Sequence, residues 1–80
     1  MSRLTLYHTA GCHLCEEAEA LILACLASRG LGAACLEWAD IAEDAALLER
    51  YGLSIPVLRQ EASGRELNWP FGWDEVQGIL

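Results

Sequence analysis

A strand pattern changes into a helix pattern near the start of this chain. Leucine alternates with Thr and Tyr in the first residues, which predicts a strand over residues 3–8. From His13 the apolar residues recur at helical spacing, and Gly30 or Gly32 closes this helix. Residues 33–38 have the composition of a second strand. A strand, a helix and a strand in this order predict two parallel strands joined by a right-handed crossover.

The rest of the chain adds a helix, a two-stranded hairpin and a last helix. We expect a helix over residues 42–51 that opens with a capping box at residues 40–43, strands over 57–60 and 65–69, and a helix over 74–80. The order β-α-β-α-β-β-α predicts an α/β fold, with a four-stranded mixed sheet and helices on both faces. With 80 residues, the whole chain is expected to form one domain.

The charge balance excludes several kinds of partner. The net charge is −7, and the basic residues are five scattered Arg, so we expect no nucleic-acid partner and no docking on anionic membranes.

No apolar leader follows Met1, and the longest apolar stretch, residues 18–27, is too short to cross a bilayer. We therefore expect a cytoplasmic protein that works as a monomer.

Cys12 and Cys15 stand where the first strand ends and the first helix begins. Free backbone N–H groups and the helix dipole at this place favour a thiolate over a thiol. Cys12 is therefore expected to act as the nucleophile in thiol–disulfide exchange. Cys15 lies one helical turn further along, and it is expected to resolve the mixed disulfide, so that the pair closes as an internal disulfide.

A C-x-x-C pair is also found as half of a zinc site. The second half is missing here, and His8 and His13 would complete a tetrahedral set only after the turn rearranged, so we expect no metal at Cys12 and Cys15. His8 is interpreted as a loop residue. His13 either tunes the thiolate of the cysteine pair or is an exposed residue of the first helical turn.

Cys25 and Cys35 are expected to be small core residues rather than redox groups. The ten residues from Cys15 to Cys25 correspond to roughly 15 Å of helical rise. A disulfide needs Cα atoms within about 7 Å of each other, so these two cysteines are too far apart to pair. A contact between Cys25 and Cys35 stays open at this stage.

The aromatic residues have two interpretations. Trp69, Phe71 and Trp73 either pack the last helix onto the sheet, which the usual burial of such side chains favours, or form an apolar patch that faces a substrate. Trp38 belongs to the core or to a strand face. The glutamates of the first helix are expected to form a solvated face.

The order of elements, the cysteine pair and Pro56 together resemble the thioredoxin superfamily, and glutaredoxins most closely. Tyr7 stands five residues before Cys12, at the place of a tyrosine common in glutaredoxins. The segment 54–56, Ser-Ile-Pro, is similar to their Thr-Val-Pro. The segment 64–71, Gly-Arg-Glu-Leu-Asn-Trp-Pro-Phe, resembles the ending of a group of short bacterial glutaredoxin-like proteins.

The resemblance implies a dithiol–disulfide oxidoreductase that takes part in cell redox homeostasis. It implies that Cys12 is the nucleophile and Cys15 the resolving thiol, that Pro56 is a cis-proline, and that the backbone of Ile55 pairs with an extended substrate. No bound cofactor is needed, because the two sulfurs carry the electrons. The implied partners are a disulfide-containing protein or a small thiol, and an external reductase or thiol that recharges the pair.

Three features depart from the glutaredoxin pattern. His13-Leu14 replaces a proline and an aromatic residue, Thr9 replaces a lysine, and residues 69–72 replace the glycine pair that helps to hold glutathione. Glutathione is therefore only one candidate for the external reductant. Two other function classes stay open, a non-catalytic thioredoxin-fold adaptor and a metal or iron–sulfur carrier.

Overall fold

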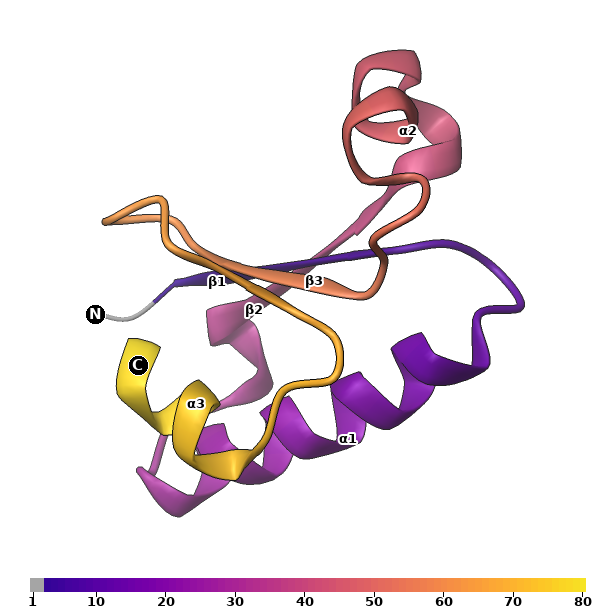
Figure 1. The fold of residues 1–80 in the computed structure, drawn as a ribbon. Coiled ribbons are helices and arrows are strands. Elements are labelled where there is room, and N and C mark those ends of the chain that lie inside the picture. Colours follow the sequence, from indigo (N-terminus) through magenta and orange to yellow (C-terminus); the bar gives the residue numbers. More distant parts are fainter. Residues whose placement is uncertain (1–2) are drawn as a thin grey trace.

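Four strands form a mixed sheet in the order β2-β1-β3-β4 (Figure 1). β1 pairs with β2 in parallel and β4 forms an antiparallel hairpin with β3, as the sequence predicted. β1 also pairs with β3 antiparallel. The computed structural model describes residues 3–80. Its strands are β1 (Leu4–His8), β2 (Leu36–Asp40), β3 (Val57–Gln60) and β4 (Glu66–Asn68).

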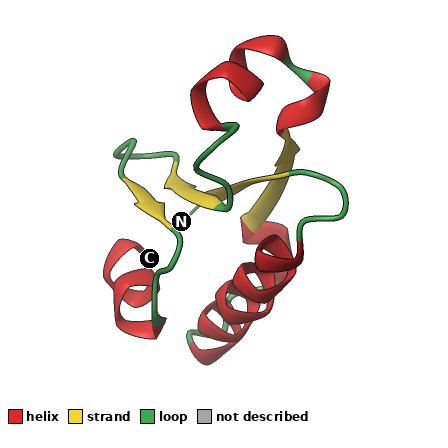
Figure 2. Cartoon of the chain, turned by 45° about the vertical axis from the view of Figure 1, so that its right-hand side comes forward, coloured by secondary structure: helices red, strands yellow, loops and turns green. Residues whose placement is uncertain are grey.

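Helices cover both faces of this sheet, which confirms the predicted α/β, thioredoxin-like arrangement. α1 (His13–Ser28) and α3 (Trp73–Ile79) lie on one face, and α2 (Ala45–Tyr51) lies on the other (Figures 1 and 2). Two 3₁₀ turns, η1 (Ala33–Cys35) and η2 (Ile41–Glu43), stand on either side of β2 in the sequence. The order of the elements is therefore the one expected.

The alternation of side chains along β1 divides the core into two clusters. Leu4 and Leu6 point toward α1 and α3, where they join the larger cluster, and both are 0% exposed. Tyr7 points the other way and joins Tyr51 and Val57 in a smaller cluster beside α2. β1 is thus buried on both faces, and its carboxyl end holds the start of α1 in a fixed place.

α1 packs through one stripe of its surface, which contains Cys15, Ala18, Ile22, Cys25 and Leu26. The stripe follows from the 3.6-residue period of the helix, because residues three and four positions apart share a face. The helix ends where Gly30 adopts a left-handed φ of 70° and its N–H donates to the carbonyl of Ala27 at 3.0 Å. Gly30, rather than Gly32, is therefore the stop signal.

The second strand starts later than predicted. A strand was expected over residues 33–38, but η1 occupies Ala33–Cys35 and β2 begins at Leu36. The reason is the length of the neighbouring strand. β1 begins at Leu4, whose partner in the parallel register is Leu36, and both strands have five residues.

The predicted capping box at residues 40–43 is wrong, because two aspartates cap two different elements. Asp40 accepts a hydrogen bond from the N–H of Ala42 at 2.9 Å, and it opens η2 rather than α2. Asp44 accepts from the first free N–H groups of α2, at 2.9 and 3.4 Å. The helix expected over 42–51 therefore begins at Ala45, after its own N-cap.

The C-terminal elements differ from the prediction by about one residue at each end, which is the usual uncertainty of such boundaries. β4 covers Glu66–Asn68 and α3 covers Trp73–Ile79.

The aromatic residues near α3 differ in burial. Phe71 is buried in the larger apolar cluster, as expected, and Trp69 is half-buried and packs against that cluster. Trp73 is 43% exposed, so the core interpretation of this residue is wrong. It is the first residue of α3.

Tyr51 connects α2 to the sheet and to the hairpin. Its ring stacks on the ring of Tyr7, with 4.2 Å between centroids, and its hydroxyl donates to the carboxylate of Glu66 in β4. Glu66 also lies 3.7 Å from Arg59 and 3.8 Å from Arg50. Burial, and after it the hydrogen bond to Glu66, raises the pKa of Tyr51 to about 12.

We expect titration of Tyr51 to lower the unfolding free energy between pH 10 and about 12. The pKa in the folded protein, about 12, lies above the ordinary value of 10.0, so the folded state holds the phenol proton more tightly than the unfolded chain does. This stabilisation is complete below pH 10 and is lost as the pH rises through 12. In urea denaturation, the stability difference between wild type and Tyr51→Phe should therefore shrink over this range. A constant difference would contradict the assignment.

Candidate active site

The turn after β1 delivers Cys12 to the start of α1. Gly11 has a left-handed φ of 75°, which lets the chain reverse without strain, and Cys12 is the N-cap residue of α1. The N–H of Cys12 donates to the carbonyl of Thr9 at 3.3 Å. The N–H of Cys15 donates to the Cys12 sulfur at 3.1 Å. One of the free backbone N–H groups at the start of this helix therefore points at the Cys12 sulfur.

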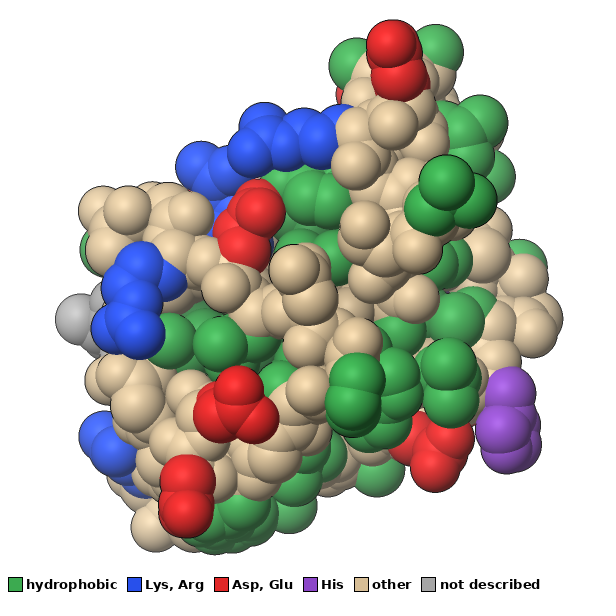
Figure 3. Space-filling model, in the orientation of Figure 1, with side chains coloured by type: hydrophobic (Ala, Val, Ile, Leu, Met, Phe, Trp, Pro, Cys, Tyr) green, Lys and Arg blue, Asp and Glu red, His purple; other side chains and the backbone are tan. Residues whose placement is uncertain are grey.

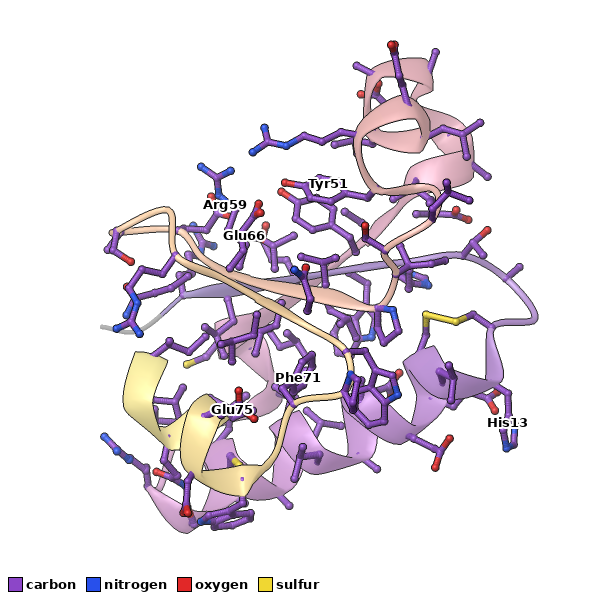
Figure 4. The ribbon with its side chains drawn as sticks, in the orientation of Figure 1. His13, Tyr51, Arg59, Glu66, Phe71 and Glu75 are labelled. Atoms are coloured by element: carbon purple, nitrogen blue, oxygen red, sulfur yellow. A yellow bond between two sulfur atoms is a disulfide. The ribbon has the colours of Figure 1, made fainter. Side chains whose placement is uncertain are left out.

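Cys12 and Cys15 form a disulfide across the first turn of α1, with their Cα atoms 5.2 Å apart (Figure 4). Cys12 is half-buried, whereas Cys15 is only 5% exposed and belongs to the buried stripe of the helix. An incoming sulfur atom therefore reaches Cys12 before Cys15. This difference agrees with the predicted division into nucleophile and resolving thiol, which stays a prediction.

The Ile55–Pro56 peptide bond is cis, as the resemblance implied. The antiparallel register pairs Tyr7 with Val57, so Pro56 lies opposite the end of β1 from which the chain runs on to Cys12. The carbonyl of Pro56 accepts a hydrogen bond from the N–H of Trp69 at 3.2 Å. A second cis bond, Trp69–Pro70, was not predicted. Pro56 itself is buried, and Ile55 is half-buried in front of it.

The backbone of Ile55 offers only one of its two polar groups to a substrate. Its N–H donates to the carbonyl of Tyr51 at 3.2 Å, whereas no N–H group within residues 3–80 donates to its own carbonyl. The predicted pairing with an extended substrate is therefore available through the carbonyl oxygen. The N–H becomes available only if the loop between α2 and β3 moves.

A cleft of about 220 Å³ opens beside the disulfide, on the side of β1 that carries β2. One wall is a stripe of α1, the floor is β1 with the turn at residues 9–11, and the other wall is the indole of Trp38 in β2. The indole N–H donates to the carboxylate of Glu19 at 3.1 Å, so the two walls are joined. The residues that line the Cys12 cleft are Leu6, residues 8–12, Cys15, Glu16, Glu19 and Trp38. His8, which was interpreted as a loop residue, is the last residue of β1.

Trp38 and Glu19 cannot be connected with the cysteine pair from the sequence alone. The expected solvated face of the first helix includes Glu19, and Trp38 was assigned to the core or to a strand face. One signal was present, because the cysteines, Glu16 and Glu19 follow an i, i+3, i+4, i+7 spacing and so share one side of the helix. The opposite wall depends on the parallel register, which pairs Leu6 with Trp38.

The family described as Glutaredoxin-like domain (DUF836) matches residues 3–80 of this chain. The chain belongs to this family. The glutaredoxin-like protein is similar to the structural genomics target protein XcR50 from X. campestris. The X-ray structure of XcR50 is 43% identical, with a TM-score of 0.72, over 94% of this chain and 91% of that chain. Its solution structure is 42% identical, with a TM-score of 0.74, over 98% and 90%.

A third solved structure extends the similarity to a more distant sequence. The solution NMR structure of protein Ne2328 from Nitrosomonas europaea is 28% identical, with a TM-score of 0.81, over 99% of this chain and 91% of that chain. No curated protein matches the chain. The comparisons identify a glutaredoxin-like member of the thioredoxin superfamily, and the names of these relatives state no reaction.

His13, the residue between the cysteines that was predicted to tune them, lies on the outer surface of this glutaredoxin-like protein. Its side chain is 86% exposed, and its Nδ1 lies 3.7 Å from the carboxylate of Glu16. Figure 4 shows His13 pointing away from the disulfide. Any influence on the thiolate therefore acts through solvent and through Glu16, and the tuning role stays a prediction.

Cys25 and Cys35 are free thiols. Cys25 is 0% exposed in the larger apolar cluster, and burial raises the pKa of its thiol. Cys35 is half-buried and packs against the same cluster. The core interpretation is therefore confirmed for Cys25, and it holds in part for Cys35.

Two further findings concern residues 3–80. The longest helix in this part of the chain, α1, has 16 residues, and no helix there combines the length and apolar character that crossing a bilayer requires. In the same residues, no group of three or more His, Cys, Asp or Glu side chains is arranged to hold a metal ion.

Proposed function

We propose that this glutaredoxin-like protein is a thiol–disulfide oxidoreductase that cycles Cys12 and Cys15 between a dithiol and a disulfide. The observation that carries the proposal is the disulfide across the first turn of α1, with its half-buried member at the N-cap and its buried member behind it. The start of a helix stabilises a thiolate through free N–H groups and the dipole. The accessible sulfur is therefore the one that the helix activates.

The reaction in the reducing direction has two steps. The Cys12 thiolate attacks one sulfur of a substrate disulfide, whose S–S bond breaks. One substrate thiolate leaves and takes a proton from water, and a mixed disulfide joins Cys12 to the other half. The Cys15 thiolate then attacks the Cys12 sulfur, which releases the second substrate thiolate and closes the protein disulfide. Two electrons have passed to the substrate, and an external thiol or thiol reductase returns two to the protein while becoming oxidised itself.

A protein disulfide is the substrate class that the surface around the site favours. Leu14, in the first turn of α1, is 46% exposed, and Leu53, in the loop that leads to Pro56, is fully exposed. Exposed apolar side chains on the two elements that carry the site offer contact area to another protein. The free carbonyl of Ile55 lies in the same loop and offers a backbone hydrogen bond to an extended segment.

We place this reaction in a reducing, cytoplasmic compartment and without a bound cofactor. Cys25 and Cys35 remain thiols, which is typical of proteins kept in such compartments. The electrons reside on the two sulfurs, so the exchange needs only an external source. Glutathione and thioredoxin reductase are the two candidates, and the net charge of −7 disfavours the anionic glutathione.

The test measures the alkylation rate of Cys12 against pH, beside turnover of a disulfide substrate with glutathione or with thioredoxin reductase as electron source. We expect Cys12 to react at a pH where an ordinary thiol, with a pKa of about 8.5, is still protonated, and one of the two sources to sustain turnover. The productive source identifies the pathway. If Cys12 reacts like an ordinary thiol and neither source supports turnover, the proposal is wrong, and a non-catalytic adaptor replaces it.

A further inference from the structure

The Cys12 cleft has the size of one side chain rather than of a whole ligand. Its volume is about 220 Å³, whereas pockets that enclose complete small molecules measure roughly 300–1,000 Å³. Both cysteines of the redox pair line it. A substrate whose disulfide meets Cys12 therefore has a recess within reach of a neighbouring side chain. This recess lies on the β2 side of the pair, away from the Ile55–Pro56 loop on the β3 side.

The lining of the cleft suits a long side chain with a cationic end. The indole of Trp38, 43% exposed, offers apolar surface on the wall opposite α1, and Leu6 lies beneath the floor without exposed surface. Glu16 and Glu19 stand at the rim. In each of them one carboxylate oxygen, Oε1, has no hydrogen-bond or ion-pair partner within residues 3–80. The stem of Lys or Arg packs on apolar surface while its charged end meets carboxylates and an aromatic face.

The arginines of the protein do not supply this charge themselves. Arg3 pairs with Glu37, and Arg50 and Arg59 pair with Glu66. On the face drawn in Figure 3, basic side chains lie beside α2, near the β3–β4 hairpin and at the lower left beside α3, all away from the start of α1. Within residues 3–80, no arginine lines the cleft, and His8 is the basic side chain that does. The negative rim of the cleft therefore remains available to a cation from outside.

We infer that the Cys12 cleft receives a Lys or Arg side chain of the substrate, and that the preferred substrates are disulfides with a cationic group close to the sulfur pair. The inference rests on the proposed exchange at Cys12 and names the substrate class for it. The shared chemistry is a protonated amine or guanidinium, and its source is either a protein or a small aminothiol disulfide.

The first experiment compares three small disulfides that differ in charge: cystamine, which is cationic, 2-hydroxyethyl disulfide, which is neutral, and dithiodipropionate, which is anionic. We expect kcat/KM for cystamine to exceed that for the neutral disulfide by about threefold to tenfold at low ionic strength, after correction for the uncatalysed rates. The advantage should fall in about 0.5 M salt, because salt screens exposed charges. If cystamine and the neutral disulfide react equally and only the anion is slow, the cleft selects no cation and the inference is overturned.

Charge-neutral variants then locate the selectivity. Glu19→Gln and Glu16→Gln should each lower the ratio of the cystamine rate to the neutral rate by about twofold to fivefold. The ratio removes any change in the reactivity of Cys12, because both substrates react with the same thiolate. Glu17→Gln is the matched control: it lies in the same turn of α1, removes the same charge, and does not line the cleft. An equal effect of Glu17→Gln would assign the selectivity to the overall field and overturn the inference.

The aromatic wall and the source of the cation have separate tests. Trp38→Leu should lower the ratio of the cystamine rate to the 2-hydroxyethyl disulfide rate, as Glu19→Gln and Glu16→Gln do. Two disulfide-linked peptides, identical except for Lys or Gln beside the cysteine, test a protein source. A gain for the Lys peptide assigns the cation to a protein, a gain for cystamine alone assigns it to a small aminothiol, and a gain for neither overturns the inference. Failure to reduce the neutral disulfide at all would instead contradict the proposed function.

Discussion

Replacing Cys12 by serine is expected to reduce disulfide turnover to background, a loss of about a thousandfold or more. The reason is chemical, since a serine hydroxyl stays protonated where a thiol at a helix N-terminus is a thiolate. The variant should still fold, because Cys12 is a half-buried N-cap residue and serine is a preferred N-cap. Turnover with 2-hydroxyethyl disulfide, measured beside the circular dichroism spectrum, checks both statements.

Cys15→Ser is expected to separate the two steps of the exchange. Cys12 can still attack the substrate, but the second thiolate is missing, so the mixed disulfide accumulates until an external thiol cleaves it. Mass spectrometry should therefore find Cys15→Ser carrying one substrate half and Cys12→Ser carrying none. The half-buried Cys35 supplies the control, because Cys35→Ser removes a thiol outside the site and should keep full turnover. Adduct formation on Cys12→Ser instead would reverse the assigned roles.

Strong local signals explain which elements were predictable. The strand over residues 3–8 and the helix that starts at His13 were located within about a residue, because their apolar residues follow one clear period. Gly30 closes the helix since only glycine adopts its left-handed φ of 70° without strain. The resemblance implied that Pro56 follows a cis bond, which the structure has, and the pairing of β3 with β1 places Pro56 opposite the carboxyl end of β1.

Competing local signals explain the wrong boundaries. Asp40 and Asp44 are both good cap residues, and the sequence does not say that the first opens a 3₁₀ turn and the second opens α2. The start of β2 depends on where β1 begins, because a strand continues only as long as its neighbour does. Tertiary contacts decide where these elements begin, and the local propensity of the sequence carries no information about such contacts.

The Cys12 cleft could not be predicted from the sequence for a related reason. The residues of its helical wall follow a local pattern in the sequence. The opposite wall belongs to β2, where Trp38 contacts Glu19 although the two residues are 19 positions apart in the sequence. The sequence allowed Trp38 to lie either in the core or on a strand face. Only the parallel pairing with Leu6 shows that Trp38 lies exposed beside the cysteines. The same holds for Tyr51 and Glu66, whose hydrogen bond joins α2 to β4.

The stability of the scaffold should depend most strongly on the buried stripe of α1, and Ile22 is its most informative member. Ile22 is 0% exposed and lies two turns after Cys15, between α1 and the sheet. Truncation to alanine removes three buried carbons and leaves a cavity, which costs about 2–5 kcal/mol in protein cores. A domain of this kind has a total stability of about 5–15 kcal/mol, so the loss is a large fraction of it.

We therefore expect Ile22→Ala to lower the unfolding free energy by about 3 kcal/mol and Ile22→Val by about 1 kcal/mol. Urea denaturation of the oxidised proteins measures both, as a lower midpoint with an unchanged slope. Leu48→Ala on α2 is the matched control, because Leu48 is 51% exposed and its loss should cost less than about 0.5 kcal/mol. If Ile22→Ala costs no more than Leu48→Ala, α1 is not held by this stripe. The position of Cys12 would then depend on the disulfide and the turn at Gly11 rather than on the packing of the helix.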